Sequence, residues 1–172
     1  ITENIHMQMN TENVKDINLL EEDLFLLNAD LRDLMKAVLS HGENFRFRAH
    51  GWSMSPFIKP GDQLIITPIN GNLLKLGQVV AFIQPGSNLC IVHRVIRRKG
   101  QDILIKGDNI NNRDDGWTPK ENILGTVNKV LRNGKRIRVG VNYGLAIIAV
   151  LSRYYALSPI ISIAATLFGK NK

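Results

Sequence analysis

Residues 78–96 read QVVAFIQPGSNLCIVHRVI, with two apolar runs, 78–83 and 89–96, on either side of Pro85-Gly86. Short apolar runs separated by turn residues are typical of antiparallel β-strands. Similar runs occur on both sides of this stretch, at 45–49, 64–67, 102–105, 125–131 and 137–139. Asn133-Gly134 separates the last two runs and has the composition of a two-residue hairpin turn. We therefore predict a mainly antiparallel β domain over residues 44–138.

The residues before this domain have a different pattern. Residues 1–17 are polar and show little periodicity, which predicts a mobile tail. Apolar side chains then recur every three or four residues, at Leu31, Leu34, Met35, Val38 and Leu39. This spacing predicts an amphipathic helix with Asn28 or Asp30 as its N-cap and Gly42 at its end. We favour packing of its apolar face on the β domain, so that residues 1–43 add a tail and one helix to an α+β, mainly β, fold.

The residues after the domain are nearly uncharged. Segments 139–152 and 154–169 contain no charged side chain, and Arg153 separates them. Neither segment reaches the roughly 20 residues of a spanning helix. A joined span would place Arg153 near the bilayer centre, at a cost of about 2.5 to 3.5 kcal/mol. We expect residues 139–172 to form apolar helices that either associate with a membrane or pack against the core.

Composition limits the classes of function. The chain has 172 residues, one cysteine and a net charge of +7. This length supports one main core, and a single cysteine excludes an internal disulfide. The positive charge suits an anionic partner, and the low aromatic content favours membrane lipid over single-stranded nucleic acid. Zinc-finger spacing and a Walker-type loop are missing from the sequence, so we expect no metal and no cofactor.

A short motif places a serine where chemistry is expected. Gly51-Trp52-Ser53-Met54-Ser55-Pro56 follows the run at 45–49 and precedes the next predicted strand, so Ser53 is expected on an exposed turn. Five further blocks follow in order, at 76–82, 92–96, 105–109, 113–115 and 123–127. Together, over about residues 49–130, these blocks resemble the type I signal peptidases, in the branch that has histidine where bacterial housekeeping enzymes have lysine.

The resemblance implies a β-rich serine peptidase that cuts a precursor peptide or preprotein after small residues. It implies that Ser53 is the nucleophile and that His93 is the general base. Asp108 and Asp114 are the implied acidic partners. We prefer Asp114 behind the histidine and Asp108 as a supporting residue, with Asp115 as the next candidate.

Residue chemistry agrees with these roles. A serine hydroxyl becomes an effective nucleophile when a nearby base takes its proton, and histidine is a suitable base near neutral pH. Along a strand of period two, His93 shares a face with Ile91, whereas Cys90 points to the other face, which argues against a Cys90/His93 pair. The Ser53 N–H is expected in the oxyanion hole. Gly51 offers no side-chain donor there, and His50 is expected beside the cleft.

Two alternatives remain beside the processing peptidase. Self-cleaving repressors share the Gly-x-Ser-Met-x-Pro pattern but use a lysine base, for which Lys106 is the available amine. A non-catalytic, peptide-binding subunit of a membrane assembly would keep the fold without needing the Ser53, His93 and Asp114 set.

The family's N-terminal membrane helix has no counterpart in residues 1–43. Five cations lie between 129 and 138, against two at 170 and 172. If the apolar segment spans once, this asymmetry predicts a cytoplasmic catalytic domain.

Overall fold

The computed structural model describes residues 29–69, 71, 73–109 and 114–138. Residues 29–40 form a helix, and the strands that follow belong to one sheet. The strands are β1 (Phe45–Arg48), β2 (Gln63–Thr67), β3 (Val79–Ile83), β4 (Cys90–Lys99), β5 (Asp102–Lys106), β6 (Trp117–Pro119), β7 (Ile123–Arg132) and β8 (Lys135–Ile137), with a 3-10 turn over Lys120–Asn122. The mainly β prediction is confirmed. The predicted C-terminal apolar helices and the predicted N-terminal tail lie outside the described residues.

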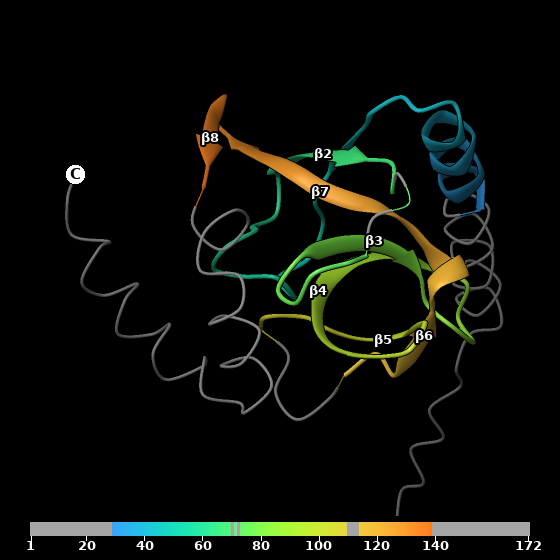
Figure 1. Ribbon diagram of the computed structural model, residues 1–172. Helices are drawn as coiled ribbons and strands as arrows, with labels where there is room; N and C mark the ends of the chain where they lie inside the picture. Colours follow the sequence, from blue (N-terminus) through green and yellow to red (C-terminus); the bar gives the residue numbers. More distant parts are fainter. Residues whose placement is uncertain (1–28, 70, 72, 110–113, 139–172) are drawn as a thin grey trace, which may run out of the picture.

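The strands pair in the order β1-β2-β7-β3-β4-β5-β6, and β8 pairs with β7. Every pairing is antiparallel. Figure 1 shows that the sheet curls, so that β3, β4 and β5 follow a tight ring while β7 crosses towards β2 and β8. β4 pairs with β3 through residues 90–94 but with β5 only from Arg94 onward. Residues 90–93 therefore have a ladder partner on one side, within the described residues.

Most strand positions agree with the apolar runs in the sequence to within one to three residues at each end. The hairpin turn at Asn133-Gly134 is confirmed, with φ values of 50° and 76° that suit the twist between β7 and β8. β6 was not predicted, because three residues are too few to show an alternating pattern.

Buried apolar side chains form two clusters on the two faces of the sheet. Alternate residues of β3 supply both: Val79 and Ala81 belong to the first cluster, and Val80 and Phe82 to the second. β3 is therefore buried on both faces, which explains its unbroken apolar sequence. The second cluster contains side chains of β3, β4, β5 and β7, among them Val95 and Ile105. The first cluster joins the helix to the sheet.

The helix packs on the sheet as expected. Met35 and Leu39 are buried in the first cluster with Leu64 and Ile66 of β2. A Cβ atom at Gly125 would lie 2.7 Å from Ile66 Cγ2 and 3.2 Å from Leu39 Cδ1, so the glycine permits this close approach.

Of the predicted helix caps, the structure confirms the C-terminal one and excludes Asp30 as the N-terminal one. Gly42 has a φ of 82° and its N–H donates to Leu39 O, which confirms Gly42 as the end of the helix. Asp30 is already helical and is not the cap, and Asn28 lies outside the described residues. Among the described residues, no helix is long and apolar enough to cross a membrane.

Candidate active site

The Ser53 loop, residues 49–62, connects β1 to β2 and is anchored by its own apolar side chains. Gly51 has a φ of 76°, a conformation that suits glycine, and turns the chain just before Ser53. The Ser55 N–H donates to Trp52 O at 3.0 Å, and the Ile58 N–H donates to Met54 O at 3.0 Å. Met54 and Ile58 are buried in the first cluster. Ser53 thus lies on a tight turn fixed by the core immediately after it.

A second segment holds the loop next to the serine. The Asn109 backbone N–H donates to Ser53 O at 2.7 Å, and its side-chain amide donates to Trp52 O at 3.2 Å. Asn109 follows Asp108, whose carboxylate accepts two hydrogen bonds from the Arg94 guanidinium, at 2.7 and 2.6 Å. Both side chains of this ion pair are fully buried. Asp108 and Asn109 together therefore connect the Ser53 loop to β4.

The far end of the loop is fixed by a second ion pair. Arg132 of β7 donates to both carboxylate oxygens of Asp62, at 2.8 and 2.7 Å, and to Phe57 O at 3.2 Å. The Lys59 N–H also donates to Asp62, at 2.8 Å. Burial acts to raise the pKa of Asp62, but these hydrogen bonds outweigh it and hold the pKa below its ordinary value.

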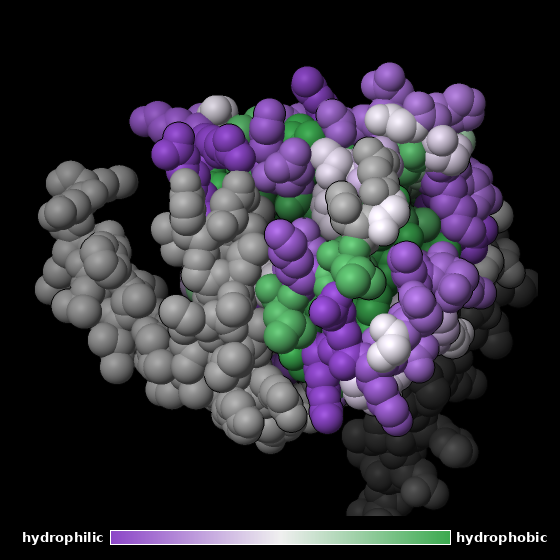
Figure 2. All heavy atoms as spheres, viewed as in Figure 1, coloured by the Kyte–Doolittle hydropathy of each residue, from purple (hydrophilic) through white to green (hydrophobic). Residues whose placement is uncertain are grey.

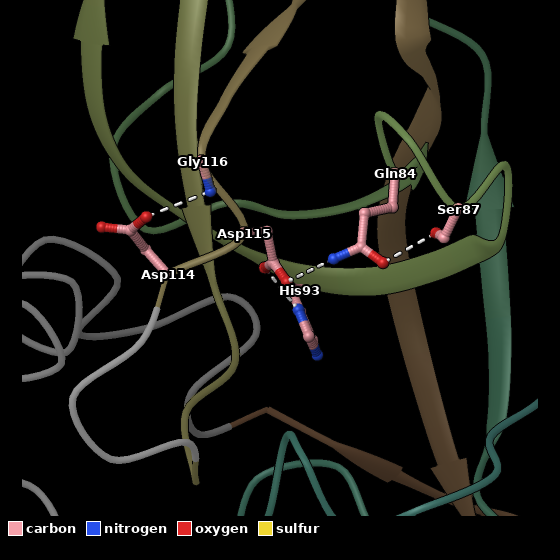
Figure 3. Close-up of polar contacts among 6 residues, drawn as sticks. All are labelled: Gln84, Ser87, His93, Asp114, Asp115 and Gly116. Atoms are coloured by element: carbon pink, nitrogen blue, oxygen red, sulfur yellow. Dashed lines mark hydrogen bonds and ion pairs between the residues drawn. The ribbon is translucent and has the colours of Figure 1, made fainter.

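His93 lies on β4, opposite Val80 of β3, and is oriented by a carboxylate. Its Nδ1 lies 2.6 Å from Asp115 Oδ2, with side chains only 5% and 8% exposed (Figure 3). A carboxylate accepts hydrogen bonds, so in the neutral ring the proton belongs on Nδ1 and Nε2 carries the lone pair. Nε2 is buried and has no hydrogen-bond partner among the described residues. The ring is thereby prepared to accept a proton at Nε2.

Asp115 is held by further contacts from two elements. Its backbone N–H donates to Ile105 O at 2.9 Å. Its other carboxylate oxygen, Oδ1, accepts a longer hydrogen bond of 3.4 Å from Gln84 Nε2, and the Ser87 hydroxyl donates to Gln84 Oε1 at 2.9 Å (Figure 3). Gln84 and Ser87 belong to the β3–β4 hairpin. Sequence reasoning missed both residues, because a glutamine and a serine near Pro85-Gly86 resemble any turn.

The structure brings Asp115, rather than the preferred Asp114, to His93. Asp114 is exposed, and its Oδ1 accepts the Gly116 N–H at 3.0 Å in a local turn. Asp108 is occupied by Arg94. The two aspartates are adjacent in sequence but have different contacts, because this turn directs Asp114 to solvent and Asp115 towards His93.

Ser53 and His93 line the same cleft, which has a volume of about 820 Å³. Most of the lining is apolar and includes Phe47, Leu64 and Ile91. Such a cleft suits apolar or small side chains of a bound ligand. Cys90 also lines it, but burial raises the pKa of its thiol to about 11, so the thiolate is scarce at neutral pH.

The remaining residues considered for the site differ in whether they line this cleft. His50 and Gly51 line it, with the His50 ring edge-on to Phe47. Lys106 is not among the described lining residues; burial lowers its pKa, although Asp114 and Asp108 oppose this. Within the described ranges, no group of three or more His, Cys, Asp or Glu side chains is arranged to hold a metal ion.

Comparison with known proteins identifies the family. A family model described as Peptidase S24-like matches residues 12–128, more than half of the chain. The chain belongs to the S24-like peptidase family. The matched range includes the Ser53 loop, β4 with His93, and Asp115.

The relatives of this S24-like peptidase agree with the signal peptidase resemblance. The signal peptidase complex catalytic subunit SEC11C of Homo sapiens is 29% identical over 121 residues, covering 61% of this chain and 63% of the relative. The SEC11 subunit of Metarhizium robertsii is 36% identical over 90 residues, covering 44% and 51%. The chain thus spans less than two thirds of the length of these curated relatives. Its membership in the type I signal peptidase-like group is confirmed.

Proposed function

We propose that this S24-like peptidase is a serine endopeptidase that cleaves a precursor or signal peptide, with Ser53 as nucleophile, His93 as general base and Asp115 as the residue that orients it. One observation carries the proposal: His93 is bonded through Nδ1 to Asp115, its Nε2 has no hydrogen-bond partner among the described residues, and His93 lines the same cleft as Ser53. This is the order of groups that serine hydrolysis requires.

The proposed reaction has two halves. Nε2 of His93 takes the proton of Ser53 Oγ as Oγ attacks the carbonyl carbon of the scissile bond. The negative oxygen of the tetrahedral intermediate accepts a hydrogen bond from the Ser53 N–H. This N–H has no acceptor among the described residues. Nε2 then gives its proton to the leaving amine, and an acyl-enzyme ester remains on Ser53. A water molecule, deprotonated by Nε2, hydrolyses the ester and restores the serine.

The proposed substrate is an extended peptide. Residues 90–93 of β4 line the cleft and, in the part of the chain that the structure describes, lack a ladder partner on one side, so their backbone offers hydrogen bonds to an added strand. The apolar lining suits small or apolar side chains near the scissile bond. The names of the relatives place them in signal peptidase complexes, and we extend a preprotein substrate and a membrane-associated assembly to this chain.

Matched variants test the assignment. Candidate precursors would be incubated with the wild type, with Ser53→Ala, His93→Ala and Asp115→Asn, and with the neighbouring controls Ser55→Ala and Asp114→Asn. We expect the first three changes to lower kcat/KM by about 10³-fold or more. The two controls should stay within about threefold, because neither side chain contacts His93 among the described residues. Equal cleavage by wild type and Ser53→Ala would exclude the proposal.

A further inference from the structure

Two cross-strand rows run over one face of the sheet at the end formed by β1, β2, β7 and β8. The first row is Arg46–Ile65–Lys129, and the second is Arg48–Gln63–Leu131–Arg136. Directly paired residues lie on the same side of a sheet, so all seven side chains emerge from one face. We call the four cations of these rows, Arg46, Arg48, Lys129 and Arg136, the cationic face.

Burial shows that this face points away from the first cluster. On β1, Phe45 and Phe47 pack against that cluster, whereas the alternating Arg46 and Arg48 are exposed. On β2, Leu64 and Ile66 are fully buried, whereas Gln63 and Ile65 between them are only half-buried. The cations are thus placed by strand alternation, on a backbone fixed by the core behind it.

Within the described residues, no acidic side chain neutralises the charges of the cationic face. None of its four side chains forms an ion pair with another residue in the part of the chain that the structure describes. Neither row contains an aspartate or a glutamate. Figure 2 shows hydrophilic residues gathered over the β7–β8 hairpin, at the upper left of that view. Like charges placed in adjacent rows repel one another, so the arrangement gains energy from an external anion.

We propose that the cationic face binds the surface of an anionic phospholipid bilayer. Neighbouring strands lie about 4.8 Å apart, so the rows spread their charges over roughly 15 Å across four strands. This breadth suits several headgroups at once better than a single small anion. The half-buried Ile65 and Leu131 between the cations add apolar area. The face contains no aromatic side chain for base stacking, which favours lipid over single-stranded nucleic acid.

Lipid binding at this face leaves the cleft available. Phe47 of β1 lines the cleft, and it lies on the side of the strand opposite to Arg46 and Arg48. The bilayer and a peptide substrate would therefore occupy opposite sides of β1. Membrane binding by this face does not depend on catalysis, so it goes beyond the proposed peptidase function.

The test compares two variants of the full chain with equal net charge. Arg46→Gln/Lys129→Gln removes two charges from one row, and Lys75→Gln/Lys99→Gln removes two from exposed lysines elsewhere. The readout is the ratio of Kd for phosphatidylcholine vesicles to Kd for vesicles that also contain phosphatidylserine. An apolar contribution from residues 139–169 affects both vesicle types and cancels in this ratio. Each cation at an anionic surface changes affinity by about fivefold, so the first variant should lower the ratio by about 25-fold.

The control variant should change the ratio by less than about threefold, since a few charges far from the bilayer act weakly at physiological salt. Both variants should keep the wild-type thermal midpoint and the wild-type rate on a soluble peptide, because the substituted side chains are exposed and lie outside the cleft. If both variants lowered the Kd ratio equally, net charge alone would explain the preference for anionic vesicles, and the proposal would be overturned. It would also be overturned if Arg46→Gln/Lys129→Gln impaired binding to a DNA duplex but left vesicle binding intact.

Discussion

At the scale of single residues, the two oxygens of Asp115 serve different partners. Oδ2 accepts from His93 Nδ1, and Oδ1 accepts from Gln84 Nε2 (Figure 3). An ionised carboxylate accepts hydrogen bonds but has no proton to donate. The amide of Gln84 must therefore turn its nitrogen towards Asp115. Its oxygen then faces Ser87, which donates to it. The hairpin therefore supports the orientation of the histidine through one intermediate carboxylate.

This relay makes Gln84 a positioning residue for the proposed reaction. Gln84→Ala removes one donor to Asp115, and a hydrogen bond to a charged group that is this long should contribute only modestly. We expect kcat to fall about three- to tenfold while KM stays within twofold, because Gln84 is not among the described residues that line the cleft. Steady-state kinetics on a soluble precursor peptide would measure the two constants separately.

Ser87→Ala and Gln84→Glu sharpen the same measurement. Among the described residues, Ser87 contacts Gln84 but not Asp115, so Ser87→Ala should lower kcat by less than twofold. Gln84→Glu keeps the size of the side chain but places a second negative charge beside Asp115, so it should be worse than Gln84→Ala. A rise in KM with unchanged kcat would instead show that Gln84 acts in substrate binding.

At the scale of elements, the Ser53 loop is held by residues from two other parts of the sheet. Asn109, after β5, binds the backbone at Trp52 and Ser53. Arg132, at the end of β7, binds the other part of the loop through Asp62 and Phe57 O. Since Met54 and Ile58 are also buried, the position of the serine depends on three separate contacts with the scaffold. The proposed nucleophile therefore lies on a fixed backbone, which is what orienting a hydroxyl towards its base requires.

The Asp62 anchor predicts a pH-dependent contribution to stability. The pKa of folded Asp62 lies below its ordinary value of 3.8, so its stabilising effect is complete well above pH 3.8 and is lost as the pH falls through the folded pKa. At pH 7, Asp62→Asn should lower the free energy of unfolding by about 2 kcal/mol, because Arg132 and the Lys59 N–H lose an ionised acceptor.

Urea unfolding at pH 7 and near pH 3 would test this dependence. The difference between wild type and Asp62→Asn should shrink at the lower pH. The control Asp102→Asn removes an exposed carboxylate at the start of β5 and should change the free energy by less than about 0.5 kcal/mol. A difference that is the same at both pH values would show that the charge of Asp62 does not matter.

Sequence patterns predicted the elements better than the contacts between them. The long strands were predictable because each carries an apolar run bounded by turn residues, whereas β6 is too short to show one. Ordered motifs singled out Ser53 and His93, and the structure brings both to the lining of one cleft. Asp115 could not be separated from Asp114, because the turn that directs one inward and one outward depends on Gly116 and Ile105. Gln84 carries no local signal, since its role comes from a contact across 31 positions.

At the scale of the whole molecule, helix, sheet and cleft share one core. Met35 and Leu39 of the helix belong to the same buried cluster as Met54, which adjoins Ser53. Met35 Sδ also lies 3.9 Å from the thiol of Cys90, a lining residue of the cleft. The predicted division at residue 43 therefore separates a helix from residues that depend on it for burial. We infer that the cooperative folding unit includes residues 29–40 together with the strands.

Two leucines of one helix test this inference. Leu39 is 5% exposed and Leu34 is 56% exposed, so the same substitution to alanine can be made on the packed and on the open face. Leu39→Ala should lower the free energy of unfolding by about 3 kcal/mol, whereas Leu34→Ala should change it by less than about 0.5 kcal/mol. Both tryptophans, Trp52 and Trp117, lie in the β region, so their fluorescence reports on the sheet while far-ultraviolet circular dichroism also follows the helix. In a single cooperative unit, Leu39→Ala shifts both urea transitions to the same lower midpoint. If the helix instead unfolds separately, the circular dichroism signal will change while the tryptophan midpoint stays at its wild-type value, and the helix will then be an appendage of the peptidase domain.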